Sequence, residues 1–197
     1  MIRLRAIRRG RGLRARALLL ALPLLSRGAA PGFATVLLFR PDFFGGPFGR
    51  YCQAVLRGPG HWTVGERELF GAAVSTGNAC GHCTGVHRRI AVDCLGEPVV
   101  GAVVDRAGEV PGDVDPALPL MTAFLQRLSH DPDGLTAADV ATLRAAGITD
   151  DAVREAAHAA AALEIANRIN TTLGSEAMAP AANRRSAAML LRRGYDL

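Results

Sequence analysis

Two cysteines and a histidine that lie close together in this sequence have the types and spacing to do redox chemistry. Cys80 and Cys83 are three residues apart, and His87 follows four residues after the second cysteine. In a helix these spacings place the three side chains on one face. Asn78 is a favoured N-cap residue, so we expect Cys80 in the first turn, where the helix dipole lowers a thiol pKa. The spacing therefore predicts an acidic pair of thiols with a base beside it.

Length and composition indicate one helical domain. The chain has 197 residues, of which 49% are hydrophobic, which is enough for one domain with a sizeable core. Alanine and leucine are abundant and only 5% of the residues are aromatic, which favours helices. Eight arginines in the first 27 residues account for the net charge of +5, and the rest carries 15 arginines against 18 acidic residues. Since the body is mildly acidic, we expect no nucleic-acid partner.

The first 32 residues form a basic segment ahead of the domain, which we place at 33–197. An arginine-rich start is followed by nine apolar residues, 17–25, which are too few for a membrane-spanning helix. A basic start, a short apolar run and small residues after it are also typical of a secretory signal. Pro23 inside the run and Arg27 after it disfavour a signal. We therefore expect a first helix, a cytoplasmic protein and no membrane partner.

Capping residues and breaks divide the rest of the chain into helices. Thr63 and Glu66 fit a capping box that starts a helix ending near Ser75, and the dithiol helix should end at Leu95. We expect irregular structure before and after these two helices, with a short strand or a loop at 99–104. Four further helices are predicted in the C-terminal half. The irregular stretches are 39–48 and 96–118, and the further helices are about 121–128, 136–147, 150–173 and 183–193.

A glutamate upstream of the cysteines completes a longer motif. Glu68 is followed after eleven residues by Cys80, after two more by Cys83 and after three more by His87. This motif resembles the signature of the alkylhydroperoxidase D-like, peroxidase-related family of the carboxymuconolactone decarboxylase superfamily. The resemblance covers about residues 35–175. It implies an all-α fold, in which a single helical domain forms a bundle that assembles into oligomers, as trimers or hexamers.

The resemblance also implies a role for each residue of the motif. Cys80 and Cys83 form a redox disulfide, and attack on peroxide is assigned to Cys83, which has His87 one turn ahead. Cys80 then resolves the sulfenic acid, although the opposite order is arguable because Cys80 is nearer the helix N-terminus. Glu68 and His87 form a proton relay, which His82, between the cysteines, joins through water.

The implied function is a thiol-dependent hydroperoxide reductase with an antioxidant role and no metal, haem or other cofactor. Its electron donor would be a dithiol, a lipoylated protein or a peroxiredoxin-like partner, and no residue identifies the donor or the hydroperoxide. One alternative is the lyase branch of the superfamily, which decarboxylates a lactone and does not need the cysteine pair. Another is a zinc-stabilised scaffold, with Cys80, Cys83 and His87 as ligands and Glu68 or Cys94 as the fourth.

Other residues are assigned to the core or the surface. We expect Cys52 and Cys94 to be buried as small hydrophobic residues, and Trp62 to anchor the core or an interface. In the helix at 150–173, a stripe of small and branched residues permits close packing and, with the amphipathic last helix, predicts a homo-oligomer. This stripe consists of Val153, Ala157, Ala160, Ala161, Ile165 and Ile169. The histidines expected at surface or packing positions are His61, His130 and His158.

Overall fold

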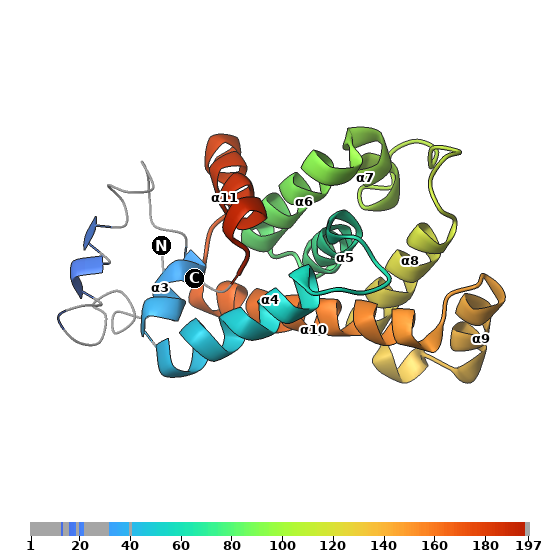
Figure 1. Ribbon diagram of the computed structural model, residues 1–197, viewed down its shortest axis with the longest axis horizontal. Helices are drawn as coiled ribbons and strands as arrows, with labels where there is room; N and C mark the ends of the chain where they lie inside the picture. Colours follow the sequence, from blue (N-terminus) through green and yellow to red (C-terminus); the bar gives the residue numbers. More distant parts are fainter. Residues whose placement is uncertain (1–12, 14–15, 19, 22–31, 40, 196–197) are drawn as a thin grey trace.

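The computed structural model describes residues 13, 16–18, 20–21, 32–39 and 41–195, and this part of the chain is all-α, as predicted (Figure 1). No strand occurs among these residues. The segment expected as a first helix or signal lies largely outside them. From residue 32 onward the helices are α3 (Gly32–Phe39), the π-helix η1 (Pro41–Phe48), α4 (Gly49–Arg57), α5 (Val64–Gly77), α6 (Gly81–Leu95), α7 (Glu97–Val103), α8 (Ala117–His130), the short 3-10 helix η2 (Pro132–Gly134), α9 (Ala137–Ala145), α10 (Asp150–Leu173) and α11 (Pro180–Arg193).

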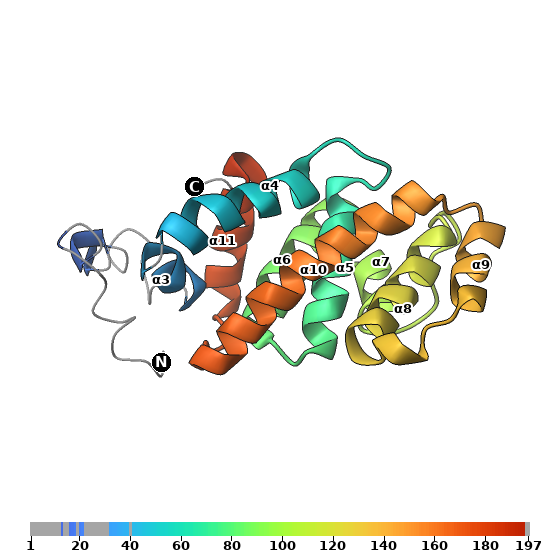
Figure 2. The ribbon, with the colours of Figure 1, turned by 90° about the horizontal axis from the view of Figure 1, so that it is seen from below.

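Helix α5 lies at the centre of the bundle. Figures 1 and 2 show it surrounded by α6, α8 and α10, and all its residues from 67 to 75 are buried. A helix buried on every side can hold a polar side chain away from solvent only if neighbouring helices supply its partners. In the part of the chain that is described, no helix is long and apolar enough to cross a membrane.

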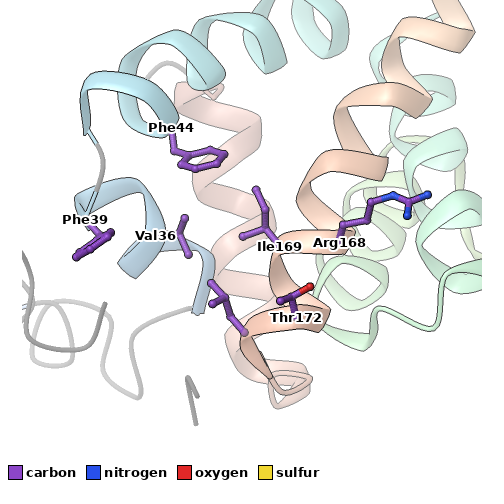
Figure 3. Close-up of a pocket in the computed structure, with 7 residues that line it drawn as sticks. Val36, Phe39, Phe44, Arg168, Ile169 and Thr172 are labelled. Atoms are coloured by element: carbon purple, nitrogen blue, oxygen red, sulfur yellow. The ribbon is translucent and has the colours of Figure 1, made fainter. Parts of the chain in front are cut away.

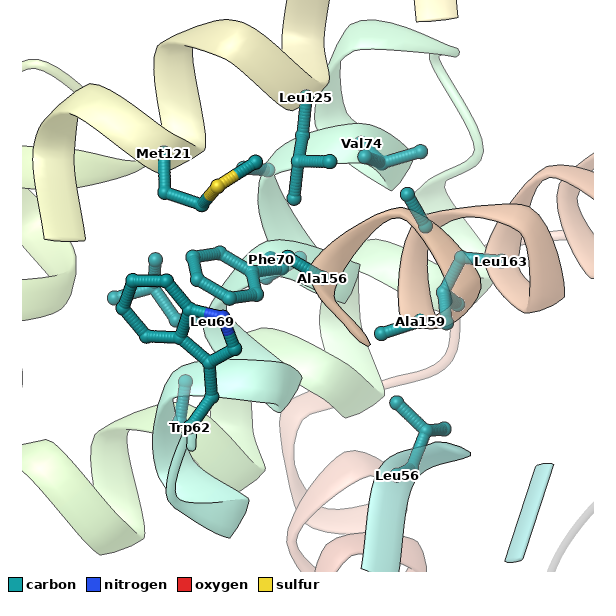
Figure 4. Packing of buried hydrophobic residues seen from close by; sticks show 14 of the residues in the cluster. Leu56, Trp62, Leu69, Phe70, Val74, Met121, Leu125, Ala156, Ala159 and Leu163 are labelled. Carbon is teal, nitrogen blue, oxygen red and sulfur yellow. The ribbon is translucent and has the colours of Figure 1, made fainter. Parts of the chain in front are cut away.

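The hydrophobic core joins α5 to α8, α10 and the loop before α5 (Figure 4). The rings of Trp62 and Phe70 meet edge to face with their centroids 5.0 Å apart, and the Trp62 indole N–H donates to the carbonyl of Ala152 at 2.8 Å. Trp62 is 3% exposed, so the prediction that it anchors the core is confirmed. Its hydrogen bond also fixes the start of α10 against the start of α5.

The caps predicted for the start of α5 and for both ends of α10 are present. The Thr63 hydroxyl accepts from the Glu66 backbone at 3.3 Å, and the Glu66 carboxylate accepts from the Thr63 backbone at 2.7 Å. Thr149 caps α10, which ends at Gly174 in the left-handed conformation with φ 72°. The boundaries predicted for α10 are therefore confirmed, and α5 extends two residues past the predicted end.

Three local predictions are wrong. Asn78 is the C-cap of α5 rather than the N-cap of α6, and Cys80 itself occupies the N-cap position, after Ala79 with φ 52°. Residues 97–103 form α7, with Pro98 in its first turn, and not a strand or a loop. The aromatic stretch from Pro41 is the π-helix η1, which continues directly into α4.

The stripe predicted on α10 is only partly buried. The buried side consists mainly of alanines and includes Ala152, Ala156, Ala159 and Leu163, whereas Ile165 of the predicted stripe is 42% exposed. Small side chains let α10 lie close to α5, so the alanines, Ala160 of the stripe among them, form the contact. Val153 is partly buried against the core, and Ile165 faces outward.

The remaining side-chain predictions are confirmed except for the one about Cys94. Cys52 is buried, as predicted, but Cys94 is exposed, because it lies near the C-terminal end of α6 beyond the core. His61, His130 and His158 are exposed, as expected.

Candidate active site

Glu68 and His87, which are 19 residues apart in the sequence, meet inside the protein. Helices α5 and α6 pack side by side, and Oε2 of Glu68 lies 2.6 Å from Nδ1 of His87. The Glu68 side chain is fully buried and that of His87 is 9% exposed. With Nδ1 bound to a carboxylate, the neutral imidazole carries its hydrogen there and leaves Nε2 as the acceptor.

Two further residues that the sequence motif does not include bind the other oxygen of this carboxylate. Oε1 of Glu68 lies 2.6 Å from Nη1 of Arg57, at the end of α4, and accepts a 2.8 Å hydrogen bond from the hydroxyl of Tyr195, which follows α11. The Arg57 side chain is 9% exposed. Neither residue stands at a spacing that relates it to Glu68, so no pattern in the sequence pointed to them.

These partners decide the charge of the buried carboxyl group. Burial raises the pKa of Glu68, but the charges and hydrogen bonds of His87, Arg57 and Tyr195 together bring it below its ordinary value. Burial and the nearby Glu68 charge raise the pKa of Tyr195 well above its ordinary value. Glu68 is therefore an ionised acceptor and Tyr195 a protonated donor at neutral pH.

Cys80 and Cys83 lie at the N-terminal end of α6 as free, buried thiols, 3% and 4% exposed. A hydrogen bond from Cys83 lowers the pKa of Cys80 to about 6, despite the opposing effect of burial. The same hydrogen bond, with burial, raises the pKa of Cys83 well above its ordinary value. The hydrogen bond therefore favours the thiolate on Cys80 over one on Cys83, to which the sequence interpretation assigned the attack.

Buried polar side chains of α10 lie behind the thiols. Nδ2 of Asn170 donates to the Cys83 sulfur at 3.4 Å and to the carbonyl of Ala166 at 3.0 Å. The Ser75 hydroxyl donates to Oδ1 of Asn167 at 3.0 Å. The sequence interpretation gave these asparagines no role, but two of them, three residues apart in an alanine-rich helix, are a usable signal, because buried amides need partners.

His82 faces a different part of the molecule from the relay. Its ring is buried and forms a hydrogen bond with the backbone of Glu176, in the segment between α10 and α11. Burial lowers the pKa of His82. Of the five residues predicted for the site, the structure brings Glu68 to His87 and Cys80 to Cys83, while His82 points to the segment that covers the start of α6.

The described residues contain no group of three or more histidine, cysteine or acidic side chains arranged to hold a metal ion. Of the two candidates for a fourth zinc ligand, Glu68 already binds His87, Arg57 and Tyr195, and Cys94 is exposed, whereas Cys80, Cys83 and His87 are buried.

A separate apolar cavity of about 360 Å³ lies between α3, η1 and the C-terminal part of α10 (Figure 3). None of the predicted site residues lines it. Its lining consists of Val36, Phe39, Phe44, Arg168, Ile169, Thr172 and Leu173.

Comparisons with known proteins locate the chain among solved helical structures. No protein-family model matches the sequence, and no curated protein matches it. A solved structure described as an alkylhydroperoxidase AhpD core, an uncharacterized peroxidase-related protein from Ralstonia eutropha JMP134, matches with a TM-score of 0.68 and 26% identity, over 87% of this chain and 90% of that one. An uncharacterized peroxidase-related protein from Silicibacter sp. TM1040 matches with a TM-score of 0.67 and 18% identity, over 84% and 85%.

Proposed function

This chain belongs to the alkylhydroperoxidase D-like, peroxidase-related family, and from that premise we propose that it is a thiol-dependent hydroperoxide reductase. The observation that carries the proposal is the hydrogen-bonded pair of Cys80 and Cys83, at the start of the helix whose next turn holds His87 against the buried carboxylate of Glu68. A low-pKa thiolate and a proton relay are the two requirements for reducing a peroxide without a metal.

In the proposed reaction a thiolate attacks the terminal oxygen of the hydroperoxide and the O–O bond breaks. The sulfur becomes a sulfenic acid, and the departing alkoxide takes a proton to become the alcohol. The second cysteine then attacks the sulfenic sulfur, the S–O bond breaks, and hydroxide leaves as water after taking a second proton. One peroxide is reduced, two thiols are oxidised to a disulfide, and an external dithiol restores them.

The Glu68–His87 pair is proposed to move these protons. With Nδ1–H of His87 held by the carboxylate, Nε2 can accept the proton of a thiol and return it to the alkoxide or hydroxide. Ionised Glu68 stabilises the imidazolium that exists between the two transfers, because its charge lies 2.6 Å from Nδ1.

The lower pKa of Cys80 supports Cys80 as the attacking thiol and Cys83 as the resolving one, which reverses the order expected from the sequence. The two orders lead to the same disulfide, but they leave the sulfenic acid on different residues. Trapping the sulfenic acid with a dimedone-type reagent distinguishes them: the Cys80 order predicts a trapped adduct in Cys83→Ser and little in Cys80→Ser.

We further propose that the electron donor is a dithiol, carried by a small molecule, a lipoylated protein or a peroxiredoxin-like partner, and that the protein is cytoplasmic. Cys80 and Cys83 are only 3% and 4% exposed. A narrow dithiol reductant can reach two cysteines that are this deeply buried, because its two sulfurs lie at the end of a flexible chain.

The deciding experiment is peroxide consumption by the purified protein with a dithiol reductant. We expect turnover by the wild type and a loss of at least about 10²-fold in Cys80→Ser and in Cys83→Ser. Cys94→Ser is the matched control, because Cys94 is an exposed cysteine of the same helix and should leave turnover unchanged.

Thiol titration and metal analysis complete this test. A small excess of peroxide should remove two thiols per chain without linking chains covalently. If both thiols stay free under peroxide, or if one equivalent of zinc accompanies the protein and protects them, the redox proposal is wrong and a metal-stabilised scaffold replaces it.

A further inference from the structure

We propose that Tyr195, beyond the last helix, is a positioning residue of the Glu68–His87 relay: its hydroxyl holds one oxygen of Glu68 so that the other faces His87. The effect of Tyr195 on turnover rests on the proposed function. Its effect on the protonation of the relay does not, because this can be measured without a substrate.

The two oxygens of Glu68 have separate partners, and Tyr195 is one of those on Oε1. Oε1 accepts from the Tyr195 hydroxyl at 2.8 Å and from Arg57 at 2.6 Å, while Oε2 lies 2.6 Å from Nδ1 of His87. The rings of Tyr195 and His87 are nearly parallel, with 9° between their planes and 6.3 Å between their centroids. With Oε1 occupied, the carboxylate cannot rotate away from the imidazole without breaking two other interactions.

The ring of Tyr195 also holds Arg57 in place. The guanidinium carbon of Arg57 lies 4.8 Å from the ring centroid, and Nε and Nη2 of Arg57 are buried without a hydrogen-bond partner. The π-face of the ring therefore takes part of the role that hydrogen bonds would otherwise have for this cation. Replacing Tyr195 by phenylalanine keeps this contact and removes only the hydroxyl.

The path of the chain to Tyr195 is fixed independently of its hydroxyl. Helix α11 ends at Arg193, and Gly194 has φ 70°, where a Cβ would overlap the side chain of Gln53. The backbone N–H of Tyr195 donates to Oε1 of Gln53 on α4 at 2.8 Å. A phenylalanine at position 195 should thus keep the same backbone, and any change in the relay would come from the lost donor.

The charged and titratable groups around the relay determine in which direction its protonation should shift when Tyr195 is replaced. The hydroxyl and the guanidinium donate to Glu68 and favour its ionised form, so losing either donor raises the affinity of the Glu68–His87 pair for a proton. The relay then becomes protonated, and unable to accept a proton, at a higher pH. The titratable and charged groups that interact with it are Cys52 and Arg57 from α4, Cys80 and Cys83 at the start of α6, and Tyr195 itself. His82, which points away, and exposed Cys94 influence it through their charge alone.

The test follows the titration of the His87 ring by NMR of isotope-labelled histidine in the reduced protein without peroxide. In Tyr195→Phe we expect the midpoint to move to higher pH by about one unit, from the loss of one hydrogen bond to a charged group. Arg57→Met should move it further in the same direction. Tyr51→Phe is the matched control, because the Tyr51 hydroxyl donates to the carbonyl of His158 and not to Glu68.

The acid limb of kcat/KM against pH should shift with the same midpoint in Tyr195→Phe. An unchanged midpoint in Tyr195→Phe, or an equal shift in Tyr51→Phe, overturns the inference even if the protein reduces peroxide. A shifted midpoint in a protein that consumes no peroxide upholds the positioning role of Tyr195 and refutes the proposed function instead.

Discussion

At the scale of single residues, the feature that needs most explanation is a carboxylate without access to water. Glu68 is fully buried, and an unpaired charge in that environment would cost several kcal/mol. It is stable there because a cation, a phenol and an imidazole surround it. A buried charge with these partners contributes little to the stability of the fold. It does fix the path of a proton, because Arg57, Tyr195 and His87 each bind a defined oxygen of Glu68.

Replacing Glu68 by glutamine should therefore affect both chemistry and stability. We expect Glu68→Gln to slow peroxide reduction by about 10²-fold, because His87 loses its anionic partner. The free energy of unfolding should fall by about 3 kcal/mol, because Arg57 stays buried beside a neutral amide. Steady-state kinetics and urea denaturation measure the two effects.

The kinetic effects of Glu68→Gln and His87→Ala should not add, since both remove the same relay. The double variant should be close to the worse single variant. Additive losses would mean that Glu68 and His87 act on separate steps.

The acidity of the thiols gives a second prediction at the same scale. Cys80 has a pKa of about 6 because Cys83 donates a hydrogen bond to its sulfur. Cys83→Ala removes this donor and should raise the pKa of Cys80 towards the ordinary value of a thiol near 9. The pH dependence of alkylation by iodoacetamide measures this pKa, with Cys52→Ala as the control for a buried cysteine outside the pair. A midpoint near 6 in Cys83→Ala would show that the position of Cys80 at the start of α6 is enough to lower its pKa without the hydrogen bond from Cys83.

At the scale of helices, capping residues were the most reliable signals in the sequence. Thr63 with Glu66, and Thr149 with Gly174, predicted the start of α5 and both ends of α10, because caps satisfy backbone groups locally. Helix α7 was missed because a run of valines favours a strand locally, whereas here Val100 and its neighbours pack on the core. The start of α6 was misplaced by two residues because Asn78 is an acceptable cap at either helix end.

The contact between α5 and the neighbouring helices depends on a glycine. A Cβ on Gly71 would lie 3.2 Å from the side chain of Leu163 on α10 and 3.5 Å from Nδ1 of His87. Gly71→Val should therefore overpack this crossing and destabilise the fold by about 1–3 kcal/mol, and it should also disturb the relay. Gly101→Val in α7 is the matched control, because nothing lies within 4 Å of its Cβ position. We expect thermal unfolding to show a clear loss in the first variant and a change within about 0.5 kcal/mol in the second; equal effects would contradict the packing argument.

At the scale of the whole molecule, part of the site could be predicted and part could not. Glu68 lies on α5, and Cys80, Cys83 and His87 lie along the next helix, α6. Their spacing in the sequence therefore indicates which of these side chains share a helix face. Tyr195 is 127 residues from Glu68, and nothing local at Tyr195 indicates where α11 will lead the chain. The contact between Tyr195 and Glu68 results from the packing of the complete helical bundle, so no local pattern in a single sequence predicts it.

The outward side of α10 bears on assembly. Ile165 is 42% exposed, and Ile169 lines the apolar cavity beside α3, so apolar surface remains on this side of a single chain. We predict a homo-oligomer, a trimer or a hexamer, at micromolar concentration. Light scattering measures it, with Ile165→Glu expected to shift the equilibrium towards smaller species by placing a charge on apolar surface. A monomeric wild type would contradict this prediction.

The stability of the molecule in acid should depend on the same buried carboxylate. In the folded chain the pKa of Glu68 lies below its ordinary value of 4.5, so near that pH the unfolded chain binds a proton that the folded chain does not. This contribution to the free energy of unfolding is complete above about pH 4.5 and is lost as the pH falls through the folded pKa. Urea unfolding at a series of pH values from 7 to 3 measures it. Glu68→Gln cannot titrate at this position, so its stability should fall less steeply below pH 4.5 than that of the wild type. Parallel curves for the two proteins would mean that Glu68 has the same proton affinity in both states, and that the exposed ion pairs of Asp139 and Asp150 account for the acid sensitivity instead.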